Sequence, residues 1–164
     1  MPPCIDVYSL STQRNPETIQ RFLQSYVNVA DALKLVDVSV APVELDEQLP
    51  IDQWEILPIP TLEDAVALGL SSPHRGFLVY LRAQAPWCGA MLSFARTGEI
   101  TFGVSVDDPL GRRKPQRIAK RLLRRLCNET GGVRGWAVHE MPLSVDPQID
   151  KPWDGKANVA EFVR

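Results

Sequence analysis

A block of strand patterns in the middle of the chain restricts the possible folds more than any other feature. GFLVYLR at 76–82 has the apolar and aromatic content of a strand, and AMLSFARTGEITFGVSV at 90–106 alternates around a turn as hairpins do. A three-residue loop at 96–98, ending in glycine, sets Phe94 opposite Ile100 and gathers the apolar residues on one face. We therefore expect three consecutive antiparallel strands. The second face of the hairpin carries Ser93, Thr101 and Ser105.

Amphipathic helices are predicted on either side of this block. Asn15 and Pro16 provide an N-cap and a first-turn proline, and apolar residues then recur at helical spacing, which predicts a helix over 16–34. A second helix starts near Pro115, and glycines at 131–132 follow its end. Its apolar stripe consists of Ile118, Ala119, Leu122, Leu123, Leu126 and Cys127.

Shorter patterns complete the order of elements. Strands are predicted at 5–10, 36–40 and 134–140, and a short helix begins after Thr61 and ends at Gly69. The resulting order is β-α-β-(short α)-β-β-β-α-β. It predicts an α+β fold, in which helices pack on one face of a mainly antiparallel sheet.

The chain as a whole has the length and composition of one soluble globular domain, 1–164. Four prolines predict an extended surface loop at 41–60, and five acids make this loop acidic. The tail at 142–164 is expected to be irregular. The start, MPPCIDVYSL, lacks the pattern of a signal peptide, and no stretch is apolar enough to span a membrane. Three scattered cysteines and two histidines predict a cytoplasmic protein without metal or cofactor.

Charge is divided unevenly along the chain, although the net charge is only −2. Residues 1–64 contain eleven acids and three bases, whereas residues 65–164 contain nine acids and fifteen bases. The acids concentrate in the loop at 41–60, and eight of the eighteen bases lie within 111–126. Such a division predicts two oppositely charged surfaces, which meet partners or each other.

The acidic loop suggests a protein-binding function. A solvated connector is the ordinary explanation for such a segment. A tryptophan among carboxylates also suits a surface for a basic partner, because aromatic anchors within a charged rim concentrate binding energy. We therefore favour a small, bacterial-type, non-catalytic protein of the immunity kind, which neutralises a basic toxic nuclease. The candidate partner-binding residues are Glu44, Asp46, Glu47, Asp52, Trp54 and Glu55.

The basic helix at 112–125 has three interpretations. Its cationic side chains form the solvated face of an ordinary surface helix, dock against the acidic loop, or bind phosphate. The candidate phosphate-binding residues are Arg112, Arg113, Arg121, Arg124 and Arg125. Nucleic acid is not the favoured ligand, because the isoelectric point is about 5.7 and no aromatic stacking surface accompanies the helix.

The sequence around the start of this helix resembles a known family. A strand ending VSVDDP, followed by Gly-Arg-Arg and a helix ending RLLRRL, is similar to the acyl-coenzyme A binding region of the GNAT acetyltransferases. The resemblance implies an acyl-CoA-dependent transferase, whose glycine-spaced turn and helix N-terminus hold the pyrophosphate. Gly111 is not followed by a second glycine, and Pro115 lacks an N–H group, so this chain departs from the pattern at that turn.

Residues that commonly carry catalysis are few. APWCGAM at 85–91 has half of a thioredoxin-type motif, but Met91 stands where the second cysteine is needed, so we expect no dithiol exchange there. His74 lies in a predicted loop, and His139 is expected to face solvent. Asp107 and Asp108 form a tight carboxylate pair, which suits either a site or a turn. Catalytic and nucleotide-binding motifs are absent, and we favour a protein that is not an enzyme.

Overall fold

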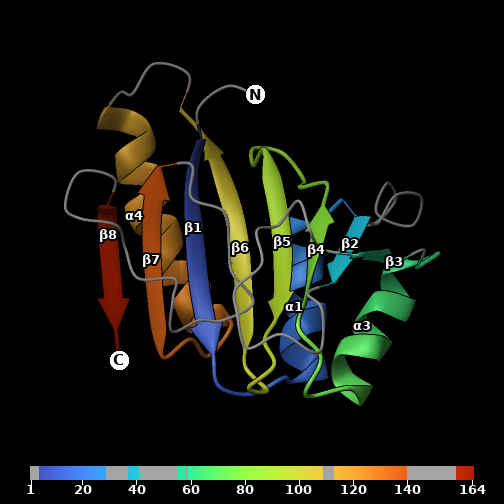
Figure 1. The fold of residues 1–164 in the computed structure, drawn as a ribbon. Coiled ribbons are helices and arrows are strands. Elements are labelled where there is room, and N and C mark those ends of the chain that lie inside the picture. Colours follow the sequence, from blue (N-terminus) through green and yellow to red (C-terminus); the bar gives the residue numbers. More distant parts are fainter. Residues whose placement is uncertain (1–3, 29–36, 41–54, 58, 109–112, 140–157) are drawn as a thin grey trace.

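The computed structural model describes residues 4–28, 37–40, 55–57, 59–108, 113–139 and 158–164. Within these residues, eight strands form a single antiparallel sheet, and the helices pack on one of its faces (Figure 1). The strands are β1 (Cys4–Ser11), β2 (Asp37–Val40), β3 (Glu55–Leu57), β4 (Phe77–Leu81), β5 (Gly89–Phe94), β6 (Ile100–Asp107), β7 (Arg134–His139) and β8 (Asn158–Val163). The helices are α1 (Pro16–Tyr26), α3 (Leu62–Ser71) and α4 (Arg113–Glu129). The predicted fold class is confirmed.

The order of strands across the sheet is β3-β2-β4-β5-β6-β1-β7-β8. Helix α4 contacts β1, β6, β7 and β8, so it covers one end of the sheet. Strands β2 and β3 form the opposite end, as Figure 1 shows. No helix in the described part of the chain is both long and apolar enough to cross a membrane.

The predicted hairpin is present in the predicted register. Phe94 pairs with Ile100, and Ala90 pairs with Val104. The Ala95 N–H donates to the Glu99 carbonyl oxygen at 3.0 Å, which leaves three residues in the loop. The last of these is Gly98, whose φ of 91° lies in the left-handed region that favours glycine. The pairing of β5 with β6 therefore agrees with the register that the apolar residues of the two strands predicted.

Helix α1 begins where predicted and ends earlier. The Asn15 side chain accepts hydrogen bonds from the backbone N–H groups of Glu17 and Thr18. The prediction of a helix over 16–34 is wrong beyond Tyr26, since Val27 has an extended conformation; residues 29–34 lie outside the described residues. The Tyr26 carbonyl accepts from the Gln84 N–H at 2.9 Å, so a tertiary contact replaces the next helical turn.

Helix α3 also differs from its prediction at the C-terminal end. Thr61 caps its start by accepting from the Asp64 N–H at 3.1 Å, as the capping pattern predicted. Gly69, which was expected to end the helix, lies within it. A methyl group at this position would overlap the ring of Phe94. This glycine is therefore required for close packing of the helix on β5 rather than for a turn.

Two segments predicted to be irregular contain edge strands. Strand β3 lies within the loop at 41–60, the rest of which is mostly outside the described residues, and β8 lies within the tail at 142–164. Both are corrections to the sequence-based order. A three-residue strand is too short to show alternation, and β8 is specified by its pairing with β7, which lies far from it in sequence.

Apolar residues are buried on both faces of the sheet. The helix-covered face contains the larger cluster, including Val7, Phe22 and Leu126. On the second face Tyr8 lies opposite Trp136 in the strand register, and their ring centroids are 5.5 Å apart. The polar residues predicted for that second face, Ser93, Thr101 and Ser105, are buried as well.

Candidate functional site

Helix α4 presents an exposed row of cations along its length, which we call the basic surface. The opposite side of the helix is fully buried, as its apolar stripe predicted, except that Ile118 is exposed. The basic surface consists of Lys114, Arg117, Lys120, Arg121, Arg124 and Arg125. Burial of the stripe fixes the orientation of α4, so these side chains are held toward solvent.

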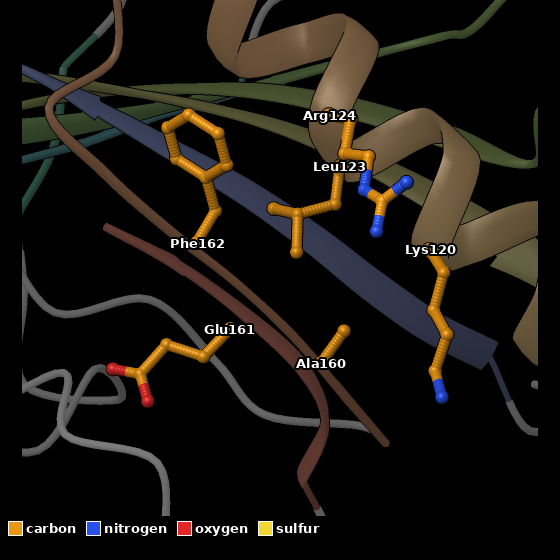
Figure 2. Close-up of a pocket in the computed structure, with 6 residues that line it drawn as sticks. All are labelled: Lys120, Leu123, Arg124, Ala160, Glu161 and Phe162. Atoms are coloured by element: carbon orange, nitrogen blue, oxygen red, sulfur yellow. The ribbon is translucent and has the colours of Figure 1, made fainter. Parts of the chain in front are cut away.

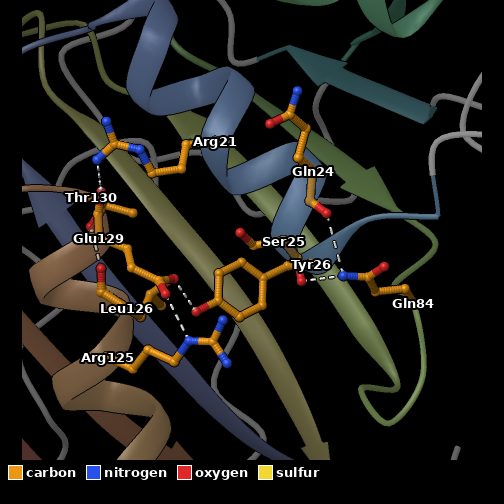
Figure 3. Close-up of polar contacts among 9 residues, drawn as sticks. All are labelled: Arg21, Gln24, Ser25, Tyr26, Gln84, Arg125, Leu126, Glu129 and Thr130. Carbon is orange, nitrogen blue, oxygen red and sulfur yellow. Dashed lines mark hydrogen bonds and ion pairs between the residues drawn. The ribbon is translucent and has the colours of Figure 1, made fainter.

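One member of the basic surface, Arg125, is bound within the molecule (Figure 3). Its Nε donates to Glu129 Oε1 at 2.7 Å, and this hydrogen bond is the main cause of the raised pKa of Arg125. The Tyr26 hydroxyl donates to Glu129 Oε2 at 2.6 Å. Burial, and then this bond, raise the pKa of Tyr26. Arg21 donates to the Glu129 carbonyl oxygen at 3.2 Å, so this network joins α1 to α4.

A groove of about 250 Å³ lies between α4 and β8 (Figure 2). Leu123 of α4 and Phe162 of β8 provide apolar lining, and Lys120 and Arg124 line the groove from α4. Glu161 extends away from α4 and lies 3.9 Å from the Nε of Arg134. Among the described residues, no carboxylate pairs with either cation at the groove. The positive charge of the basic surface is therefore not balanced by a described carboxylate at the groove.

The structure brings together part of the predicted phosphate-binding set. Arg121 and Arg124 lie on the exposed side of α4, while Arg125 is engaged by Glu129. Arg113 is the first residue of the helix, and Arg112 lies outside the described residues. The turn on which the GNAT resemblance rests spans residues 109–112, which are also outside them.

Of the predicted partner-binding residues the structure describes one, Glu55, at the other end of the sheet. Glu55 is the first residue of β3 and pairs with Val40 of β2. Glu44, Asp46, Glu47, Asp52 and Trp54 lie outside the described residues. The strands that flank this segment are therefore separated by β4 and β5 from the four strands that α4 contacts.

Two cysteines meet at the end of the sheet where β1 begins. The sulfur atoms of Cys4 and Cys88 are 3.4 Å apart. Burial raises the pKa of Cys88 to about 12, and the hydrogen bond with Cys4 and the charges of Cys4 and Asp107 add to this effect. The missing second cysteine of the motif, from which we expected no dithiol exchange, does not leave Cys88 without a neighbouring thiol. Met91 does occupy the motif position, but β1 supplies the partner from elsewhere in the sequence.

A histidine and a carboxylate lie at the same end of the sheet. His139 Nδ1 is 4.0 Å from Asp108 Oδ2, and Asp108 is only 1% exposed. His139 is partly buried rather than fully facing solvent as predicted, and it lies beside this carboxylate. Asp107 is exposed, so the predicted carboxylate pair is divided between two environments, and His74 lies exposed in a loop. In the described ranges no group of three or more His, Cys, Asp or Glu residues is arranged to hold a metal.

Comparisons with known proteins give distant similarity among solved structures. No family model and no curated protein matches the chain. Among solved structures, the T6SS protein PA0821 of Pseudomonas aeruginosa is similar, with 12% sequence identity and a TM-score of 0.43. The match covers 92% of this chain and 46% of that protein, so the chain spans about half of its length.

Proposed function

We propose that the protein is a non-catalytic binding module of the immunity kind. It uses the acidic loop at 41–60, called the acidic segment from here on, to hold a basic protein partner. The observation that supports this function is the order of strands. Strands β2 and β3, which flank the acidic segment, stand at one end of the sheet, and α4 with its basic surface covers the other.

The distance between the two ends makes them electrostatically independent. Three to six steps of roughly 4.8 Å between neighbouring strands separate β2 from the strands that α4 covers, which amounts to about 14 to 29 Å. At physiological ionic strength the Debye length is about 8 Å. Charges exposed at one end are therefore largely screened from charges at the other. A basic partner approaching β2 and β3 is not repelled by α4.

The acidic segment has the composition of a binding surface with a central anchor. Trp54 supplies a large apolar group, and Asp52 and Glu55 flank it closely in sequence. Carboxylates steer a basic partner and fix its register, while a buried aromatic anchor contributes most of the affinity. A toxic nuclease, whose active site is basic because it binds phosphate, has the complementary chemistry.

Calorimetric titration against a panel of strongly basic nucleases tests this proposal. We expect one member to bind with an affinity that falls as salt is raised, and Trp54→Ala to weaken it by roughly 30-fold or more, equivalent to about 2 kcal/mol. Arg117→Gln on α4 is the control and leaves that affinity unchanged. Absence of binding across the panel, or equal losses for both variants, would overturn the proposal.

A second candidate function is phosphate or nucleic-acid binding by the basic surface. It is favoured by the groove, where Lys120 and Arg124 have no carboxylate partner among the described residues. Titration with labelled single-stranded RNA tests it. If it is correct, the logarithm of the affinity falls linearly with that of the salt concentration, and Arg121→Gln with Arg124→Gln reduces the slope by about 0.7 for each lost phosphate contact. Trp54→Ala leaves RNA binding unchanged.

A further inference from the structure

Cys4 and Cys88 are brought together from positions that are 84 residues apart. Cys4 is the first residue of β1 and pairs with Asp107 in the register of β1 with β6. Cys88 immediately precedes β5, and its N–H donates to the Ser105 carbonyl oxygen of β6 at 3.1 Å. The two thiols therefore meet over the end of β6, each at the end of its own strand, where the backbone adjusts more readily than within a ladder.

The third cysteine lies in a different environment. Cys127 lies on the buried side of α4 and is completely buried, which raises its pKa. Cys88 is exposed and Cys4 is partly exposed, so solvent and small molecules reach this pair. Any reaction of the native protein with a thiol reagent is thereby directed to Cys4 and Cys88.

We propose that Cys4 and Cys88 are a reversible disulfide site, which is closed by a small-molecule disulfide such as oxidised glutathione. One cysteine thiolate attacks the glutathione disulfide and releases the first glutathione thiolate. The second cysteine attacks the resulting mixed disulfide and releases the second. Two electrons pass from the protein to the oxidant, and the two thiol protons end on two molecules of reduced glutathione.

Closure requires both the sulfur atoms and the strand ends that carry them to move. An S–S bond is about 2.05 Å long, so the sulfur atoms, now 3.4 Å apart, approach by roughly 1.4 Å. The raised pKa of Cys88 keeps its thiol protonated at neutral pH. Since exchange proceeds through a thiolate, this raised pKa slows attack by Cys88 on a disulfide, and the reaction is favoured by alkaline pH.

Closure links β1 to the start of β5 across β6. A cross-link between positions this far apart removes much conformational freedom from the unfolded chain. We expect oxidation to raise the midpoint of thermal unfolding by roughly 5–15 °C. The site therefore ties the stability of the sheet to the redox state of its surroundings.

The test uses the full chain incubated with oxidised glutathione at mildly alkaline pH. We expect the intact mass to fall by two hydrogen atoms and digestion to release one peptide joining Cys4 to Cys88. Dithiothreitol reverses both changes. The Cys127→Ala variant closes in the same way, whereas Cys4→Ser and Cys88→Ser each stop at a glutathione adduct. A wild-type chain that keeps a glutathione adduct without closing, or that does not react while folded, contradicts the proposal.

Discussion

The two ends of the sheet are built in different ways. At one end, α4 is a long helix whose buried stripe packs on four strands and whose opposite side forms the basic surface. At the other end, β2 and β3 are strands of four and three residues that flank the acidic segment. At the α4 end the same helix supports the fold and displays charge. At the β2–β3 end most of the acidic residues lie between the two strands in sequence, outside the described residues. Substitutions at the α4 end should therefore separate stability from surface charge within one helix.

Truncation of the α4 stripe is expected to have the largest effect. Leu126 is completely buried, and Leu126→Ala should lower the free energy of unfolding by about 3 kcal/mol, because it removes apolar contacts and leaves a cavity. Urea denaturation measures this change. Leu70→Ala in α3, at a partly buried position, is the matched control and should cost about 1 kcal/mol. Equal losses of unfolding free energy would contradict the view that the buried stripe of α4 contributes more to stability than the partly buried residues of α3.

Loss of a polar contact at the C-terminal end of α4 is expected to lower the free energy of unfolding by the second-largest amount. The Thr130 hydroxyl donates to the Leu126 carbonyl oxygen at 2.7 Å and lies 2.7 Å from Ser9 Oγ. Thr130→Val keeps the shape and leaves the buried Ser9 hydroxyl without this partner, so we expect a loss of about 2 kcal/mol in chemical denaturation. The corresponding change at the exposed Thr97 in the hairpin loop should stay within about 0.5 kcal/mol. A similar loss at both positions would show that burial of the hydroxyl is not what matters.

A smaller effect is expected in α3, the helix that follows β3. Thr61→Ala removes the side chain that caps the Asp64 N–H and should cost about 1 kcal/mol. Thermal unfolding followed by circular dichroism measures the shift in midpoint. Thr12→Ala, at an exposed position outside the helices, is the control and should leave the midpoint nearly unchanged. If Thr61→Ala is equally silent, the cap does not limit the stability of the molecule.

Removal of charge from the basic surface should affect stability least. Arg121→Gln combined with Arg124→Gln should change the free energy of unfolding by less than about 0.5 kcal/mol, because both side chains are exposed and no acid pairs with them among the described residues. The same denaturation curves provide the measurement. A clear loss of stability would instead support docking of the acidic loop at 41–60 on α4.

Sequence patterns predicted the parts of the fold that depend on local information. The hairpin register follows from which residues of two adjacent strands are apolar, and the orientation of α4 follows from the spacing of its stripe. The C-terminal end of α1 was mispredicted because the apolar period continues past Tyr26, while the backbone there bonds to Gln84, a distant residue. Strand β8 was missed for a related reason, since its pairing with β7 is long-range.

The candidate sites also differ in whether local sequence information was enough to predict them. The exposed position of Arg121 and Arg124 was predictable from helical periodicity. The pairing of Cys4 with Cys88 was not, because it depends on β6 lying between β1 and β5. Two cysteines near strand ends were the available signal, and the order of strands was needed to interpret it. The proximity of Asp108 to His139 was hidden in the same way.

The claim that the two charged ends act independently is tested most directly by one comparison of affinities. Binding of the basic nuclease identified in the panel is measured for two charge-matched variants, Glu44/Asp46/Glu47→Gln and Arg117/Lys120/Arg121→Gln. We predict that the first weakens binding about tenfold or more, while the second changes it by less than about threefold, because the two ends lie more than one Debye length apart. Weakening by the α4 variant as large as that by the acidic variant would contradict the account.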